Sequence, residues 1–143
     1  MIAKVFFDTN VIIDAFTMYD YSYIPSRNLL RAVVADEIEG YICVKQITDI
    51  YYILRSYVPN KDKRKQIIRD INDLFKLLPL LSSDIAASIN IENDDYEDAI
   101  LEEVGRVNVM KYFVTNNTNH FKNSKMCVVT PAELIALVEM GRQ

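Results

Sequence analysis

The chain has 143 residues, of which 50% are hydrophobic and 25% charged, and this favours a single folded domain over residues 1–143. No apolar run approaches the roughly 20 residues of a membrane span, and the N-terminal MIAKVFFD lacks the regions of a signal peptide, so we expect a cytoplasmic protein. The net charge of −4 argues against a general nucleic-acid coat protein, which is usually basic. It does not exclude a nuclease, because an acidic metal site can lie within a modestly acidic total.

The first part of the chain predicts a strand, two helices and a second strand. Residues 2–7 form an apolar run typical of a buried strand, and the pattern over 9–16 then favours a short helix. A longer helix is predicted over 26–39 and ends at Gly40, since glycine commonly follows the last helical residue. The run YICV over 41–44 has no polar alternation, as expected for a strand covered on both faces.

The rest of the chain continues to alternate between helices and strands. The predicted elements are a helix over 46–58, an amphipathic helix with apolar positions from 67 to 78, a strand over 78–81, a helix opening at 83–84, a helix over 94–109, strands over 112–115 and 126–129, and a closing helix that starts at 130–131. Such alternation indicates an α/β fold, a three-layer α/β/α sandwich with a short, mainly parallel central sheet.

Several segments are predicted to place acids or amides at the carboxyl edge of this sheet, where functional groups gather in such folds. Asp8 ends the first strand, and Asp49 lies near the start of the helix that leaves the next one. Asp95 and Asp98 open a helix at the same edge, and Asn117 follows a later strand. Clustered carboxylates repel one another unless a cation neutralises them, and such hard oxygen ligands suit magnesium or manganese.

Structural roles for these residues compete with the functional ones, and the residues alone leave several open. Asp8 could cap the helix that follows it, because aspartate is a favoured N-cap. Asp94 is assigned to a helical first turn, where negative charge suits the macrodipole, whereas Asp98 lies one turn in and is harder to explain in that way. Asp49 could be a solvated helix residue and Asn117 a turn residue.

The side chains that other catalytic chemistries need are scarce. Cys43 and Cys127 lie in separate apolar runs without CxxC spacing, so both are predicted to be reduced, buried thiols. His120 is the only histidine, which gives little support to a His-based zinc site or a Ser-His-Asp triad. Acid–base or metal chemistry in this chain must therefore depend mainly on carboxylates.

Four stretches, FFDTNVIIDAF, ITDIYYILR, DYEDAI and YFVTNN…F…VVTPAEL, together resemble the PIN domain in order and separation, and especially bacterial PIN proteins related to VapC toxins. The resemblance implies a Mg²⁺- or Mn²⁺-dependent ribonuclease, commonly dimeric and commonly the toxin of a toxin–antitoxin pair. RNA, a small antitoxin and a second copy of the chain are thus the implied partners. By position, Asp8 and Asp98 would bind the cation. Asp49, Asp95 and Asn117 would complete the shell around the cation, with Asp95 as a third metal-binding acid.

The chain also departs from the family pattern. Lys111 stands before the YFVT strand where members often have an aspartate, and Asn116 takes the place of a usual arginine. Asn117 stands where many members carry an aspartate, and it adds no charge. These departures leave open a second hypothesis, a catalytically degenerate PIN-like module that binds RNA or protein. In that case the Lys111 ammonium could pair with Asp98 in place of the cation.

Overall fold

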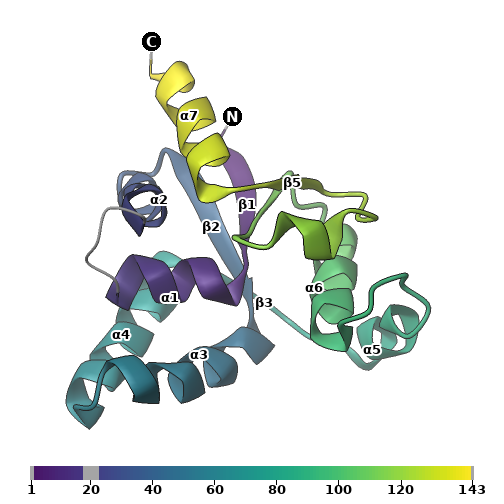
Figure 1. Cartoon of the computed structure of the whole chain (residues 1–143), viewed down its shortest axis with the longest axis horizontal. Helices are drawn as coiled ribbons and strands as arrows, with labels where there is room; N and C mark the ends of the chain where they lie inside the picture. Colours follow the sequence, from purple (N-terminus) through teal and green to yellow (C-terminus); the bar gives the residue numbers. More distant parts are fainter. Residues whose placement is uncertain (1, 18–22, 143) are drawn as a thin grey trace.

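The computed structural model describes residues 2–17 and 23–142, which form an α/β/α sandwich (Figure 1). In chain order the elements are β1 (Ala3–Phe7), α1 (Thr9–Thr17), α2 (Ile24–Val34), β2 (Ile38–Cys43), α3 (Val44–Tyr57), α4 (Lys61–Leu74), β3 (Lys76–Leu78), α5 (Ser82–Ser88), α6 (Tyr96–Val107), β4 (Tyr112–Val114), the 3-10 helix η2 (Thr118–Phe121), β5 (Cys127–Val129) and α7 (Pro131–Gly141). The strands form a five-stranded sheet in the order β3-β2-β1-β4-β5, and every neighbouring pair is parallel. The predicted fold class is confirmed.

The middle strand, β1, sends alternate side chains into two apolar cores. Val5 and Phe7 belong to the core shared with α1, α2, α3, α4 and α7, and Phe6 belongs to the core shared with α6. Figure 1 shows these two groups of helices on either side of the sheet. Because helices cover both faces, the strands are apolar on both faces, and this is why their sequence runs lack alternation. In the described ranges no helix combines the length and apolar content needed to cross a bilayer.

The helix predicted over 26–39 is wrong at its C-terminal end. The helix α2 ends at Val34, and the chain then reverses through Asp36, which has a left-handed conformation (φ 58°). Gly40 is not a helix stop, because it lies inside β2. A Cβ atom at Gly40 would lie 2.7 Å from ring carbons of Phe75, closer than side chains tolerate. Glycine is therefore required here by a tertiary contact.

Two smaller predictions are also corrected. The strand predicted over 78–81 is β3 at Lys76–Leu78, and it stops before Pro79, which has no N–H to donate to a sheet. Cys43 is buried as predicted, but Cys127 is exposed. Cys127 opens the edge strand β5, so only one neighbouring strand covers it.

Candidate active site

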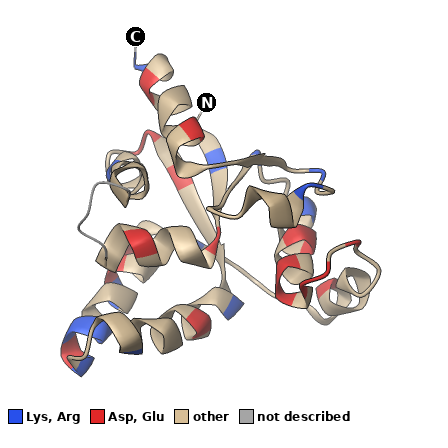
Figure 2. Ribbon diagram, in the orientation of Figure 1, with Lys and Arg blue, Asp and Glu red and all other residues tan. Residues whose placement is uncertain are grey.

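The carboxyl ends of β1 and β4 border a pocket of about 260 Å³, together with α1, α3, α6 and the turn before η2. Its lining residues are Asp8, Thr9, Asn10, Lys45, Gln46, Asp49, Ile53, Asp95, Glu97, Asp98, Leu101, Asn117 and His120. Figure 2 shows acidic segments along α6, which forms one side of this pocket. The structure thus brings together the five residues to which the sequence analysis gave a catalytic or metal-binding role: Asp8, Asp49, Asp95, Asp98 and Asn117.

Asp8 is fixed at the end of β1 by hydrogen bonds from both neighbouring segments. Its Oδ2 accepts from Thr115 Oγ1 at 2.7 Å and from Asn10 Nδ2 at 3.3 Å, and its Oδ1 accepts from the Thr9 N–H at 2.7 Å. Burial raises the pKa of this carboxyl, and these bonds only partly oppose the shift. A standard N-cap accepts from the second or third helical N–H, whereas Asp8 accepts from the first. Asp8 is therefore not simply the cap of α1.

Asp98 lines the same pocket as Asp8 from the first turn of α6, and His120 lies beside it. Burial, and then the charges of Asp95 and Asp8, raise the pKa of Asp98 to about 6, against the opposing charge of His120. The Nδ1 atom of His120 lies 3.5 Å from Oδ2 of Asp98, which is too long for a good hydrogen bond. Among the described residues this buried oxygen has no hydrogen-bond partner. The pocket therefore contains a buried carboxylate oxygen whose neighbour, His120, lies at ion-pair distance but too far for a good hydrogen bond.

Asp95 has a structural role that its place in the motif does not reveal. Its Oδ1 accepts from the N–H groups of Glu97 (2.9 Å) and Asp98 (3.2 Å), so it is the N-cap of α6. The same carboxylate lines the pocket and raises the pKa of Asp98. Asp95 therefore orients the turn that presents Asp98, in addition to adding negative charge beside it.

Asp49 is paired with a cation from its own helix. Lys45 Nζ donates to Asp49 Oδ2 at 2.6 Å, and both side chains are partly exposed. Burial by itself would lower the pKa of Lys45, but the hydrogen bond and charge of Asp49 raise it overall. In this arrangement Asp49 is neutralised within α3, and the ammonium of Lys45 lies on the pocket wall.

Gln46 is a residue of the site that the sequence analysis missed. Its Nε2 donates to Phe7 O at 2.9 Å and to Thr9 Oγ1 at 3.2 Å, and its Oε1 accepts from the Cys43 N–H at 2.7 Å. The side chain is 1% exposed and joins the start of α3 to the end of β1. A signal was present, because Gln46 lies four residues before the buried Ile50, on the apolar face of α3.

The two asparagines after β4 have different positions. Asn117 lines the pocket just before η2, and its N–H donates to Thr115 Oγ1 at 3.0 Å. Asn116 faces α1 instead, where its Nδ2 donates to Asp14 Oδ2 at 2.7 Å and its N–H to Asn10 Oδ1 at 3.3 Å. Asn117 is therefore the asparagine that is placed for a role in the pocket.

The proposed pairing of Lys111 with Asp98 is wrong. Lys111 precedes β4, and its N–H donates to Lys4 O at 3.2 Å. It lines a separate depression at the amino edge of the sheet with Glu37. The length of the strand separates the two ends of β4, so Lys111 and Asp98 lie at opposite edges. The basic group beside Asp98 is His120, which the sequence analysis set aside.

A family model for the PIN domain matches residues 4–119, most of the chain. The chain belongs to the PIN domain family. PIN domains are generally nucleases. The position of the acidic pocket at the carboxyl edge of the sheet is the position where α/β folds commonly place such chemistry.

Solved structures share this fold over nearly their whole length. The FitAB complex bound to an IR36 DNA fragment has a TM-score of 0.68 at 16% identity, over 89% of this chain and 94% of that chain. A toxin–antitoxin complex from Klebsiella pneumoniae has a TM-score of 0.66 at 24% identity, over 89% and 97%. PAE2754 from Pyrobaculum aerophilum has a TM-score of 0.67 at 10% identity, over 96% of each chain. At these identities the likeness shows the fold, and a comparison with curated proteins found no match.

The pocket of this PIN domain has donors that fit a divalent cation. Mg²⁺ is commonly held by one or two carboxylates, with waters and substrate phosphates completing the shell. Asp8 and Asp98 supply two carboxylates from separate elements, and the buried Oδ2 of Asp98 lacks a hydrogen bond among the described residues. Across residues 2–17 and 23–142, no three His, Cys, Asp or Glu side chains already stand at ligand distances. A cation at this site would therefore bind Asp8 and Asp98 after small movements of their side chains.

Proposed function

We propose that this PIN domain is a divalent-metal-dependent endoribonuclease, which hydrolyses RNA phosphodiester bonds with Mg²⁺ or Mn²⁺ and is the toxin of a VapBC-like toxin–antitoxin pair. The observation that carries the proposal is the pair Asp8 and Asp98, which face one pocket with raised pKa values. Perturbed carboxyls of this kind concentrate at functional sites. A cation between them would offset the burial that raises both pKa values, and the repulsion by Asp95 and Asp8 that raises the pKa of Asp98 further.

The residues around this pair have distinct parts in the proposed reaction. Asp8 and Asp98 hold the cation, and Thr115 orients Asp8 through its 2.7 Å hydrogen bond. A bound cation would lower the pKa of a water molecule and neutralise charge on the scissile phosphate. Asn117 contributes an uncharged side chain to the same wall. It can donate to or accept from the substrate without adding charge.

Lys45 and Asp49 are proposed to position the substrate. The ammonium of Lys45 lies on the pocket wall, where it can contact a phosphate oxygen of RNA. Its 2.6 Å bond to Asp49 holds it there until substrate arrives. Lysine suits this task as a compact point charge on a flexible stem.

The antitoxin is proposed to act at the same pocket. Solved toxin–antitoxin complexes with this fold support such a partner. An antitoxin arginine placed between Asp8 and Asp98 would make charge-assisted hydrogen bonds and exclude the cation. The homodimer implied by the resemblance stays a prediction, and the mass measured by light scattering in solution tests it.

One observation favours the second hypothesis, a PIN-like binding module without turnover. Two acids of the pocket already have basic neighbours, since Asp49 is paired with Lys45 and Asp98 lies beside His120. Such neighbours could take the place of a cation. Calorimetric titration with Mn²⁺ separates the hypotheses, because the degenerate module binds no metal in this pocket.

The test of the proposed function is cleavage of a labelled single-stranded RNA in Mn²⁺, Mg²⁺ or chelator. The natural chain is compared with Asp98→Asn and with Asp94→Asn, an exposed acid nearby that does not line this pocket. Metal-dependent cleavage that Asp98→Asn abolishes and Asp94→Asn leaves intact supports the nuclease. Cleavage that survives Asp98→Asn contradicts it.

A further inference from the structure

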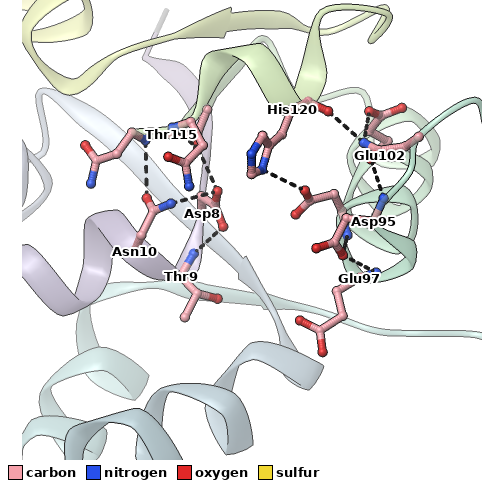
Figure 3. A network of polar contacts seen from close by, with 12 residues as sticks. Asp8, Thr9, Asn10, Asp95, Glu97, Glu102, Thr115 and His120 are labelled. Atoms are coloured by element: carbon pink, nitrogen blue, oxygen red, sulfur yellow. Dashed lines mark hydrogen bonds and ion pairs between the residues drawn. The ribbon is translucent and has the colours of Figure 1, made fainter. Parts of the chain in front are cut away.

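His120 is placed inside the acidic pocket, although it comes from a different segment than either acid. Its Nδ1 lies 3.5 Å from Asp98 Oδ2, and its charge also acts on Asp8. Figure 3 shows its ring pointing into the space between Asp8 and the acids at the start of α6. The imidazole is therefore directed at the same space as the two carboxylates.

The backbone of His120 is anchored, so this placement is built into the fold. Its N–H donates to Asn117 O at 3.0 Å, and its carbonyl accepts from Asn93 Nδ2 at 2.9 Å. Asn93 Nδ2 also donates to Glu102 Oε1 at 3.0 Å, which joins η2 to α6. The next residue, Phe121, is buried in the core. The ring itself remains 57% exposed and can adjust toward a ligand.

The separation of the two side chains suits ligands of one ion. Two neighbouring ligands at about 2.1 Å from a cation lie roughly 3 Å apart. The 3.5 Å between His120 and Asp98 is close to that spacing. Asp8, Asp98 and His120 do not yet stand at ligand distances as a set among the described residues, so their side chains must move for all three to bind one ion. A neutral imidazole supplies one lone pair for this purpose, and Asp98 Oδ2 is an acceptor with no hydrogen bond among the described residues.

We infer that His120 is a nitrogen ligand of the cation held by Asp8 and Asp98, and that it makes the site prefer Mn²⁺ to Mg²⁺. The inference rests on the proposed metal-dependent function and specifies its cofactor. Imidazole suits transition metals, whereas Mg²⁺ takes oxygen ligands and keeps its waters. A site with two carboxylates and one imidazole therefore gains affinity for Mn²⁺ without a matching gain for Mg²⁺.

A simple ion pair between His120 and Asp98 predicts a different result for His120→Ala. If the imidazole were only a positive neighbour, its removal would strengthen the binding of both metals alike. If the imidazole is a ligand, its removal weakens Mn²⁺ binding and leaves Mg²⁺ binding nearly unchanged. The ratio of the two dissociation constants therefore separates a ligand from a counter-charge.

The experiment measures Mn²⁺ binding by electron paramagnetic resonance and Mg²⁺ binding by competition, on the full chain without RNA. The variants are His120→Ala and, as a matched control, Asn119→Ala, an exposed neighbour outside this pocket. We expect the preference for Mn²⁺ over Mg²⁺ to fall about tenfold in His120→Ala and to stay unchanged in Asn119→Ala. Pulsed measurements should detect ¹⁴N coupling to Mn²⁺ in the natural chain, even if His120→Ala fails to fold.

An unchanged preference, tighter binding of both metals in His120→Ala, or absence of ¹⁴N coupling would overturn the inference. RNA cleavage is measured separately. Cleavage supported equally by both metals, without ¹⁴N coupling, leaves the nuclease in place and removes His120 from the ligand set. A nitrogen-bound Mn²⁺ in a chain that cleaves no RNA supports the ligand assignment and removes the nuclease.

Discussion

The acids at the two ends of the sheet lie in opposite environments. At the amino end, Glu37 accepts two hydrogen bonds from the Arg142 guanidinium, at 2.5 and 2.7 Å, and they lower the pKa of Glu37. Glu39 accepts from Tyr41 Oη at 2.8 Å and from Lys76 Nζ at 3.0 Å, and the pKa of Glu39 is likewise lowered. Each of these acids is paired and exposed enough to be solvated, so its charged form is favoured.

At the carboxyl end, Asp8 and Asp98 are more deeply buried and have no lysine or arginine partner among the described residues. The pKa values of Asp8 and Asp98 are raised, chiefly by burial, and His120 opposes this only in part. A fold optimised only for stability would pair these groups as it pairs Glu37. Their unfavourable setting is typical of functional sites, where stability is reduced to keep groups ready for a ligand. The acids at the two ends of the sheet thus lie in different environments and, in our proposal, have different functions.

The largest expected effect tests that difference in function. Asp8→Asn should lower the rate of RNA cleavage by at least ~100-fold. Mutation of a residue that only supports a metal ligand costs about 10–100-fold in affinity or activity, and loss of the ligand itself should cost more. Glu37→Gln, the same chemical change at the amino end, should leave the rate unchanged. Initial rates with saturating Mn²⁺ measure both. Equal losses in the two variants would show that the ends do not differ in the proposed way.

The next effect concerns what holds the carboxyl end together. Gln46→Ala removes a side chain that is 1% exposed and leaves the Phe7 carbonyl and the Cys43 N–H without this partner. The free energy of unfolding should fall by about 2–3 kcal/mol, as for buried polar groups left unsatisfied. Gln66→Ala, on the exposed face of α4, should change it by less than about 0.5 kcal/mol. Urea denaturation measures both, and a loss at Gln46 as small as at Gln66 would contradict the structural role.

Local sequence patterns were sufficient to locate β1, β2, β4 and β5 and to bring the predicted acids to one edge of the sheet, whereas the third strand was placed too late in the chain. Apolar runs without alternation identified β1 and β2, and parallel strands bring their carboxyl ends to one edge. Asp8 and Asp98, 90 positions apart in the chain, could therefore be placed at one rim before the structure was known. What the sequence could predict here depended on the order of the elements and needed no side-chain contact.

The features that could not be predicted all depend on contacts between distant segments. Gly40 resembled a helix stop, and only the ring of Phe75 explains why that position tolerates no side chain. His120 was set aside because zinc sites need several histidines, yet it belongs to a pocket whose other members are carboxylates. Lys111 was predicted to lie beside Asp98 because of its position in a motif. In the structure it directly precedes β4, at the opposite edge of the sheet from Asp98.

Asp98→Asn should make the metal-free protein more stable at neutral pH. The pKa of Asp98 rises from 3.8 to about 6 on folding, so the folded state disfavours the charge. The contribution of Asp98 to the stability of the natural chain is therefore fully present below about pH 4 and is lost as the pH rises through about 6. In chelator, the melting temperature of Asp98→Asn should exceed that of the natural chain by a few degrees at pH 7 and match it near pH 4. Asp94→Asn should show no such pH-dependent gain in melting temperature. An Asp98→Asn variant that is less stable than the natural chain at pH 7 would contradict the raised pKa.

The smallest expected effect has the opposite sign and lies at the amino end. Because the pKa of Glu39 is lowered on folding, its charged form stabilises the fold above its unfolded value of 4.5, and this contribution is lost as the pH falls through the folded value. Glu39→Gln should therefore lower the melting temperature at pH 7, by less than Asp98→Asn raises it, since the pair with Lys76 is exposed and screened by salt. The difference should shrink in high salt and vanish at low pH. If Glu39→Gln instead raised the melting temperature at pH 7, the two ends of the sheet would share one electrostatic environment, and the raised pKa of Asp98 would no longer distinguish the pocket.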